Sequence, residues 1–465
     1  MNHLALVRIF SLIGIYLSGV ILACALVAFA VGQQDQAWVF VGAAAASGPL
    51  GATILLLTGK PRQKSRAVDG LALAVLFWIF VPIFGAIPFL PAVETGGFLT
   101  AYYEAVSCLT TTGHSVLTSD LSSSLMLWRA ALHIVGAVGA MTIAATVLSA
   151  LNLGGPGIHR SRFFTIPEGS FFDALPRVIR LSFTIIALTI LILTALLIVT
   201  GIDPDDAFLG AVSAATTGLV DPDSHTVPPE NAFAIVILSL GLVSGMLGLI
   251  VIDHLSQREY TKAANDPEVV AMSGSLVGIA FLAFLAGVPI FSAFGWAVSS
   301  LSTSGIALAD PLRLERIPLV LALFPVLIGG SALSAAGGVK LGRLIVLSKR
   351  VTLEFTQLGY RGSVQTFTFR GRRQSEETVM GVWVYLVGYI IAAVVGILLL
   401  SLIGQPFPYA IRTAIGSLTN AGHILAGAGE LTNPALQIGA ILGMILGRIE
   451  VIALVPALSP SFWQR

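Results

Sequence analysis

A short motif of hydroxyl-bearing or small residues running into a glycine occurs four times in this chain. The four copies are Leu109–His114, Ala215–Leu219, Leu301–Ile306 and Leu418–His423. Each copy follows an apolar stretch of only about half the roughly 20 residues that cross a bilayer, and lies between two long apolar runs. The copies recur at intervals of roughly one hundred residues, far longer than a solenoid repeat. This pattern predicts four units of helix, half-helix with loop, and helix, whose loops face one another around one axis.

Composition places this fold in a membrane. Of the 465 residues, 56% are hydrophobic and 11% are charged, against about 25% charged in a soluble domain. The long apolar runs exclude a β-barrel, whose strands are short and alternate. Cys24 and Cys108 both lie in apolar stretches, so neither a disulfide framework nor a thiolate metal site is expected. The sequence therefore predicts an all-α integral membrane protein.

Two spanning helices, 10–32 and 37–58, are expected before the four units and form an N-terminal domain at 1–66. The pore units then occupy 67–180, 181–266, 267–376 and 377–465. Their half-helices are expected at 99–110, 205–215, 292–301 and 408–418. Their second helices are expected at 127–152, 231–252, 316–348 and 433–457.

The charges predict the orientation of the chain. Lys and Arg gather at 60–66, 154–180 and 349–373, which assigns these segments and both termini to the cytoplasm by the positive-inside rule. Arg129 falls on the outer side in this topology. Many acids also fall outside, near the loops, with Glu104 among them. A negative vestibule would raise the local cation concentration, although ordinary solvated loop ends would place acids there too.

Four glycine-bearing loops at membrane depth are typical of a cation pore. Irregular backbone is tolerated there only inside protein or beside water. Glycine frees φ so that carbonyl groups can turn inward, and carbonyl oxygens replace part of an ion's hydration shell. Each half-helix would aim its partially negative C-terminal end at the axis. The motifs hold no ring of carboxylates, as a divalent site would prefer, so a monovalent cation is expected. The predicted selectivity filter comprises Thr110, Thr111, Thr112, Gly113, Ala215, Thr216, Thr217, Gly218, Ser302, Thr303, Ser304, Gly305, Thr419, Asn420, Ala421 and Gly422.

The second helix of the third unit contains a break. Glycines at 329, 330, 337 and 338 cost roughly 1 kcal/mol each relative to alanine in a helix. The helix should open into a loop that obstructs the pore and moves, although small residues could also serve a close helix contact. Lys340 would snorkel to the inner interface or face the pore. The predicted gate residues are Gly329, Gly330, Ser331, Ser334, Gly337, Gly338, Lys340 and Arg448.

Arg448 is a charge within the last apolar run, and an intramembrane charge is a functional candidate by default. A position facing the conduction path below the filter would make it a barrier to cations. The alternative is a structural role, paired with Glu450 or with backbone carbonyls.

These residues resemble the Trk/Ktr/HKT superfamily of potassium and sodium transporters, most closely its bacterial TrkH-type branch. The resemblance covers nearly the whole chain. It rests on the four loops, the glycine-rich run 329–340, the C-terminal run 447–463 and the two leading helices. It implies a pseudo-fourfold pore, a homodimer in the bacterial inner membrane and K⁺ conduction past the filter glycines. By match these are Gly113, Gly218, Gly305 and Gly422, with the glycine-rich loop as gate and Arg448 as the pore-facing arginine.

The resemblance also implies a partner and an ion. The expected partner is a cytosolic nucleotide-binding ring of the TrkA/KtrA kind, which would carry the regulatory nucleotide. No organic cofactor is then expected on this chain, which would bind K⁺ and membrane lipid, and no nucleic acid. Within the superfamily, serine replacing the first filter glycine accompanies Na⁺ selectivity, and position 113 is glycine here.

His114 and His423 depart from the family pattern, which has small residues or proline after the filter glycine. The two histidines could meet across the outer mouth and make conduction pH-sensitive. The alternative is that both are vestibule side chains without a regulatory role.

Two other functions compete with a K⁺ pore. A Na⁺-permeable or H⁺- or Na⁺-coupled K⁺ transporter is the nearer alternative, although no carboxylate relay is evident in mid-helix. A membrane-embedded enzyme built from His133, Ser331 and Ser334 is conceivable as a nucleophilic site. No motif supports it and one active site does not need four repeats, so the chain is not expected to be an enzyme.

Overall fold

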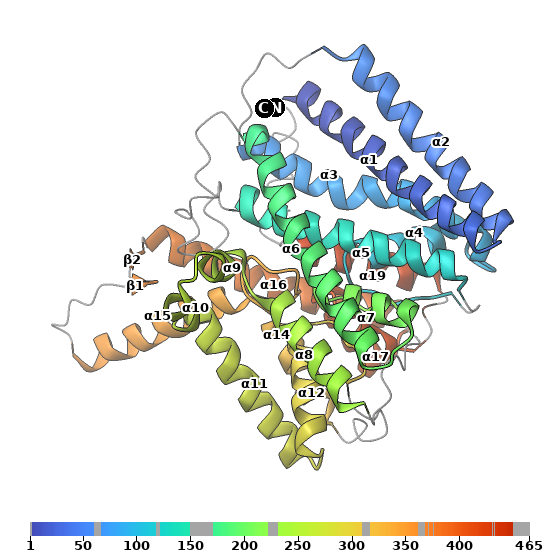
Figure 1. Cartoon of the computed structure of the whole chain (residues 1–465). Coiled ribbons are helices and arrows are strands. Elements are labelled where there is room, and N and C mark those ends of the chain that lie inside the picture. Colours follow the sequence, from blue (N-terminus) through green and yellow to red (C-terminus); the bar gives the residue numbers. More distant parts are fainter. Residues whose placement is uncertain are drawn as a thin grey trace.

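The structure is a computed structural model (Figure 1). It describes residues 2–59, 67–117, 121–148, 171–221, 231–308, 317–360, 368–370, 372–374, 376–429, 431 and 433–449. Most of the basic stretch 154–180, Glu450 and the C-terminal run to Trp463 lie outside these residues.

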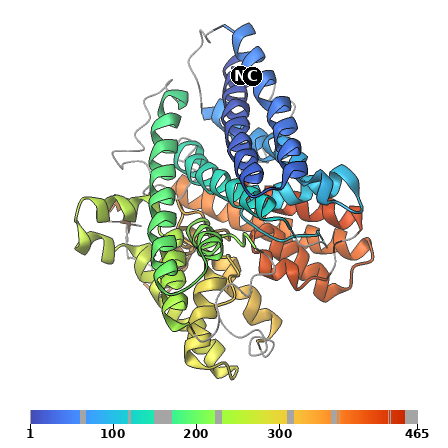
Figure 2. The same cartoon turned by 45° about the vertical axis from the view of Figure 1, so that its right-hand side comes forward.

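Two long helices precede the four units, as predicted. They are α1 (His3–Ala30) and α2 (Gln34–Leu57), and they pack along their whole length. Small residues allow the close approach, because a Cβ added at Gly51 would lie 2.6 Å from the Ser11 carbonyl oxygen. Figure 2 shows this pair rising beside the remaining helices.

Each of the four units contains a first helix, a short half-helix and a second helix. The first unit has α3 (Ala67–Ala86), η1 (Ile87–Ala92), α4 (Gly97–Leu109), α5 (Ser123–Ile143) and the π-helical turn η2 (Ala144–Leu148). The second has α6 (Phe171–Val199), α7 (Pro204–Thr216), α8 (Ala232–Met246), α9 (Leu249–Ser256) and α10 (Tyr260–Ala264). The third has α11 (Pro267–Leu285), α12 (Ile290–Leu301), α14 (Leu319–Ile328) and α15 (Leu341–Gly359). The fourth has α16 (Glu376–Leu402), α17 (Phe407–Leu418), α18 (Gly422–Ala426) and α19 (Pro434–Ile449).

The helices suit a bilayer in length and surface. Among the described residues, seven helices are long and apolar enough to cross a membrane, and α8 with α9 makes an eighth if the bent pair counts as one span. Large apolar side chains point outward from these helices, with Leu56 86% and Leu402 83% exposed. Such exposure is costly in water but not against lipid tails. The fold is therefore an all-α membrane fold with four helix–loop–helix units, as predicted.

The second helix of the second unit is broken, where a continuous span over 231–252 was predicted. Helix α8 ends at Met246, and α9 leaves it at an angle of 107°. The chain between them bonds to residues of the third unit: the Ser331 amide donates to the Met246 carbonyl (3.0 Å) and the Leu249 amide donates to the Leu333 carbonyl (3.3 Å). Hydrogen bonds to another segment replace those that a continuous helix would make, which sequence periodicity cannot reveal.

The predicted break in the third unit is present. Helix α14 ends at Ile328 and α15 begins at Leu341. We call residues 329–340 the intramembrane loop. A two-residue antiparallel hairpin, β1 (Thr368–Phe369) with β2 (Arg372–Arg373), was not predicted. Figure 1 shows this hairpin, α9, α10 and α15 gathered at one side of the molecule.

Candidate functional site

Four half-helices end at the four copies of the motif. Helix α4 ends at Leu109, α7 at Thr216, α12 at Leu301 and α17 at Leu418. The residues at these ends are almost completely buried, including the hydroxyl-bearing Thr110, Thr217, Thr303 and Thr419. The last turn of each helix carries carbonyl groups without helical partners and the negative end of the macrodipole. The four C-terminal ends therefore lie beside four buried polar loops.

In addition to the positive φ of Gly113 and Gly305, each loop has one non-glycine residue with a left-handed backbone. These residues are Thr111 (φ 54°), Thr217 (φ 54°), Thr303 (φ 62°) and Asn420 (φ 55°). A left-handed conformation costs roughly 1–2 kcal/mol for an L-residue with a Cβ. The same strained position recurs in all four units, and strain of this kind clusters at functional sites. It also supplies a common register for comparing the loops.

This register corrects the prediction for the second loop. Gly113, Gly305 and Gly422 each stand two positions after the left-handed residue, whereas Gly218 stands one position after it. Hydrogen bonds agree, because the amides of Thr112, Gly218 and Ala421 each bond to the carbonyl five residues earlier. Leu219 thus occupies the position that glycine fills in the other three loops. Sequence reasoning matched the four copies by their glycines, which shifted the register of the second loop by one residue.

In each of three loops, a serine hydroxyl bonds to the backbone seven residues further along the chain. Sequence reasoning missed these serines. The Ser107 hydroxyl donates to the carbonyl of His114 (2.6 Å), and the Ser299 hydroxyl donates to that of Ile306 (2.7 Å). The Ser213 hydroxyl accepts from the Val220 amide (3.1 Å), again seven residues on. The repeated serine four residues before the left-handed position was visible in the sequence. It would have given the correct register for the second loop.

The loops contact one another in the cyclic order of the units. The Asn420 amide group of the fourth loop donates to the Thr112 hydroxyl of the first (3.2 Å). A Cβ added at Gly113 would lie 1.9 Å from the Leu219 carbonyl oxygen of the second loop. The Ser304 hydroxyl of the third donates to the Gly218 carbonyl of the second (3.5 Å). Together with the contact between the third and fourth loops described below, these contacts close a ring.

A glycine on the second helix of three units allows that helix to approach its own half-helix. A Cβ added at Gly136 of α5 would lie 1.7 Å from the Leu109 carbonyl oxygen, and one at Gly447 of α19 would lie 2.2 Å from that of Leu418. One at Gly245 of α8 would lie 3.1 Å from that of Ala215. Gly136 therefore has a packing role at the base of the first loop.

The intramembrane loop lies directly beneath the ring. Its Gly337 amide donates to the Thr303 hydroxyl (2.9 Å), and a Cβ added at Gly337 would lie 1.8 Å from the Thr419 carbonyl oxygen. Gly329 and Gly338 have positive φ, at 71° and 78°, which a Cβ would disfavour. Ser331 and Ser334 are buried, and the Ser334 hydroxyl donates to the Ser331 carbonyl (2.8 Å). The loop is thus compact and hydrogen-bonded to the third loop above it.

Lys340 ends the intramembrane loop and binds it through its side chain. Its backbone is left-handed (φ 80°) and its side chain is 8% exposed. The ammonium group donates to the carbonyls of Ser334 (3.3 Å) and Ala336. The charge therefore binds the loop's own backbone and does not reach an interface as a snorkelling lysine would.

Arg448 joins the ring to the intramembrane loop. Its guanidinium donates to the Thr110 carbonyl (2.7 Å), the Ala335 carbonyl (2.7 Å) and the Thr111 hydroxyl. Of the two expectations for this residue, the bonds to backbone carbonyls are present, and the position facing a conduction path stays a prediction. Pairing with Glu450 lies outside the described residues.

The two histidines after the filter glycines do not face each other. His114 Nδ1 lies 2.7 Å from the Tyr103 hydroxyl on its own half-helix. His423 packs against the third loop, where a Cβ added at Gly305 would lie 2.5 Å from its Nδ1 atom. Burial lowers the pKa of both rings, and the charge of Arg129 lowers that of His114 further. The predicted meeting of the two rings across the mouth is therefore wrong.

Glu104 was predicted in an exposed acidic vestibule and is instead fully buried. Its carboxylate pairs with Arg129 of α5 at 2.6 Å, and neither side chain is exposed. By contrast, Asp203, Asp205 and Asp206 at the start of α7 are exposed. A lone carboxylate in this interior would be too costly, so the arginine accompanies it.

The residues considered for an enzyme do not assemble into a site. His133 lies in α5, where its Nδ1 is 2.8 Å from the Arg129 carbonyl oxygen. Ser331 and Ser334 lie in the intramembrane loop, and no hydrogen bond among the described residues joins either serine to His133.

Comparisons with known proteins agree with this fold. No protein-family model matches the chain. The chain is 26% identical over 497 residues to the Trk system potassium uptake protein TrkH of Escherichia coli K12, covering 100% of both chains. It is 28% identical over 439 residues to TrkH of Vibrio parahaemolyticus, covering 87% of both. The crystal structure of the potassium transporter TrkH from Vibrio parahaemolyticus shares its fold, with a TM-score of 0.86, 23% identity and 100% coverage of both chains.

Proposed function

We propose that this chain, whose resemblance to the Trk-type potassium transporter superfamily is confirmed by matches over 100% and 87% of its length, is the pore-forming subunit of a K⁺ uptake system. The observation that carries the proposal is the closed ring of four buried loops at the ends of four half-helices. The membrane is the bacterial inner membrane, with both termini in the cytoplasm, and two copies form a homodimer. The membrane potential drives uptake with about 2.3 kcal/mol per charge per 100 mV.

The ring supplies groups suited to K⁺. Threonine and serine hydroxyls and backbone carbonyls lie in it, and α4, α7, α12 and α17 direct their negative ends toward it. Such oxygens replace a hydration shell without adding a full negative charge. We assign the filter to Thr110–Gly113, Thr216–Leu219, Ser302–Gly305 and Thr419–Gly422, with Leu219 in the place first given to Gly218. The chain itself needs no organic cofactor for this role.

The intramembrane loop acts as the gate. It lies under the third and fourth loops through Gly337 and is joined to the first through Arg448. Opening must break the Gly337–Thr303 bond and the Arg448–Ala335 bond, or carry these groups along. The loop contains four glycines and is not helical, so its backbone can change conformation without unwinding a helix.

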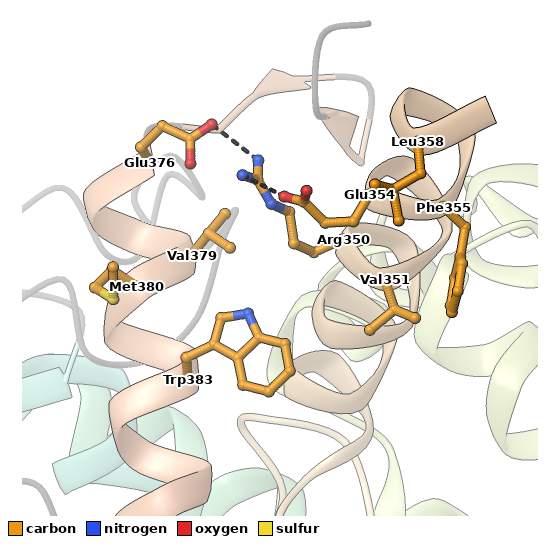
Figure 3. A pocket seen from close by; sticks show the side chains of 9 residues that line it. All are labelled: Arg350, Val351, Glu354, Phe355, Leu358, Glu376, Val379, Met380 and Trp383. Atoms are coloured by element: carbon orange, nitrogen blue, oxygen red, sulfur yellow. Dashed lines mark hydrogen bonds and ion pairs between the residues drawn. The ribbon is translucent and has the colours of Figure 1, made fainter. Parts of the chain in front are cut away.

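A cytosolic nucleotide-binding ring regulates this gate from the inner face. Helix α15 supports this, because it begins directly after Lys340 and its far end carries exposed apolar side chains, with Phe355 70% and Leu358 75% exposed. A groove of about 490 Å³ separates this end from the start of α16. Figure 3 shows Arg350 between Glu354 and Glu376 in this groove, at 2.7 and 2.9 Å. A protein seated on this groove could move α15 and, with it, the gate.

A second set of contacts links the inner side to the gate. Arg370 of the small hairpin donates to the Asp266 carboxylate at 2.9 and 3.0 Å and lies 3.3 Å from that of Glu268. Glu268 in turn packs against the first turn of α15, which directly follows the intramembrane loop, since a Cβ added at Gly342 would lie 2.3 Å from its carboxylate oxygen. A partner that displaces the hairpin would therefore disturb the environment of the gate.

The test is ion uptake into proteoliposomes that hold the purified chain. We expect K⁺ uptake to exceed Na⁺ uptake, and Gly113→Ser to reduce the preference, because its backbone needs φ 79° and its Cβ would meet the Leu219 carbonyl. Addition of a nucleotide-binding ring should raise the flux. Equal K⁺ and Na⁺ flux with the ring present would contradict a K⁺-selective filter, and flux reversed by a pH gradient alone would indicate a proton-coupled transporter.

A further inference from the structure

The buried ion pair between Arg129 and Glu104 reaches two of the four filter loops. Arg129 Nη1 lies 2.6 Å from the Glu104 carboxylate. Its Nη2 donates to the Gly113 carbonyl (2.7 Å), and its Nε donates to the Val220 carbonyl (2.7 Å). Gly113 belongs to the first loop, and Val220 directly follows Leu219 of the second. One guanidinium thus binds a carboxylate, the first loop and the second loop at once.

Glu104 extends this set of contacts along the first loop. Its other carboxylate oxygen accepts from the Ser115 hydroxyl (2.9 Å) and the Val116 amide (2.7 Å). These two residues follow the filter glycine in the chain. The pair therefore fixes the extended chain from Gly113 to Val116, and it does so from α4 and α5, two helices that belong to the scaffold.

The geometry changes what the first filter glycine does. Its carbonyl accepts from Arg129 and is therefore directed at the side chain of α5. A carbonyl held by a charged donor is oriented more strongly than one held by a neutral donor. The positive φ of Gly113 serves this outward direction. The sequence had predicted that glycine would turn this carbonyl toward the axis.

We propose that Arg129 is a positioning residue for selectivity, which with Glu104 holds the first and second filter loops at a set separation. This inference rests on the proposed K⁺ pore and adds to it a residue that touches no ion. Arginine suits the role because its planar fork offers several donors in fixed directions. A lysine presents its donors from a single nitrogen, so it cannot reach the Glu104, Gly113 and Val220 oxygens together.

The decisive variant is Arg129→Lys, which keeps a positive charge beside Glu104. We expect it to insert and purify as a monodisperse protein, to keep conducting K⁺, and to lose its preference for K⁺ over Na⁺ by about tenfold or more. That factor is the value of one charge-assisted hydrogen bond. Arg412→Lys is the matched control, since Arg412 lies on another half-helix and packs against Gly427. It should leave the preference unchanged.

A second variant separates positioning from folding. Glu104→Gln keeps an oxygen for Arg129 but places an amide NH₂ against the Ser115 and Val116 donors, so we expect it to fold and to lower the K⁺/Na⁺ flux ratio less than Arg129→Lys does. If Arg129→Lys conducts with the wild-type ratio, the inference is overturned while the K⁺ pore stands. If Arg129→Lys yields no folded protein, the double variant Arg129→Gln with Glu104→Gln removes both buried charges. An unchanged ratio there would also overturn the inference. Absence of K⁺ preference in the wild type would instead refute the proposed pore.

Discussion

Replacing Gly136 by alanine should impair the filter from behind. The added methyl group would lie 1.7 Å from the Leu109 carbonyl oxygen, whereas real Cβ contacts essentially never fall below 3.0 Å. Either α5 or α4 must therefore withdraw by more than an ångström. Leu109 is the last helical residue before the first loop, so a displacement of α4 moves Thr110 and Thr111 with it.

The size of the effect follows from overpacking. Inserting a methyl group into a tightly packed interior costs about 1–3 kcal/mol, and every 1.4 kcal/mol corresponds to roughly a factor of ten. A displacement of this size also exceeds the difference between the radii of K⁺ and Na⁺. We therefore expect both a lower unfolding temperature in detergent and a several-fold smaller K⁺/Na⁺ flux ratio.

The assay pairs this variant with Gly278→Ala. Gly278 lies inside helix α11 and has nothing within 4 Å of an added Cβ, so alanine there should be neutral or stabilise by up to about 1 kcal/mol. Thermal unfolding and ion flux are measured on both proteins. If Gly136→Ala matched Gly278→Ala in unfolding temperature and in flux ratio, the argument from close approach would be refuted.

Three further predictions concern the gate, a loop brace and pH. Lys340→Met removes the charge that binds two carbonyls of the intramembrane loop, so basal K⁺ flux should rise about tenfold; unchanged flux would argue against this loop as gate. Ser299→Ala leaves the Ile306 carbonyl without its donor and should cost about 1 kcal/mol of stability, seen as a lower unfolding temperature. Burial, and then the charge of Arg129, lowers the pKa of His114 in the folded protein. Its contribution to stability is therefore complete above the unfolded pKa of about 6.5 and declines as pH falls below it. His114→Asn should show a smaller decline, and equal declines would contradict this assignment.

Sequence reasoning succeeded where a local pattern reports a global constraint. Apolar runs separated by half-length stretches predicted the four units, because a bilayer demands a set length of apolar helix. The glycines of 329–340 predicted the break between α14 and α15 from helix propensity alone. Sequence reasoning failed for the break between α8 and α9, because that break is stabilised by hydrogen bonds to Ser331 and Leu333 of another unit. No feature of the sequence 231–252 indicates these hydrogen-bond partners.

The four loops show the same division at the level of single residues. The motif residues were found from the sequence, but Gly218 was matched to the wrong position, because glycine was taken as the marker while the backbone repeats at Thr217 and its equivalents. Glu104 was placed in a vestibule because a lone acid near a loop is usually solvated. Only the approach of α5 brings Arg129 to it.

The amino-acid sequence by itself determined the membrane environment, the four-unit architecture and the segments that form the loops and the intramembrane break. These follow from hydropathy and backbone propensity, which act within a few residues along the chain. The tertiary structure decided the register of the second loop, the partners of Arg129, Lys340 and Arg448, and the separate directions of His114 and His423. These depend on which carbonyls and side chains meet across units, and such meetings are set by packing between segments far apart in the chain.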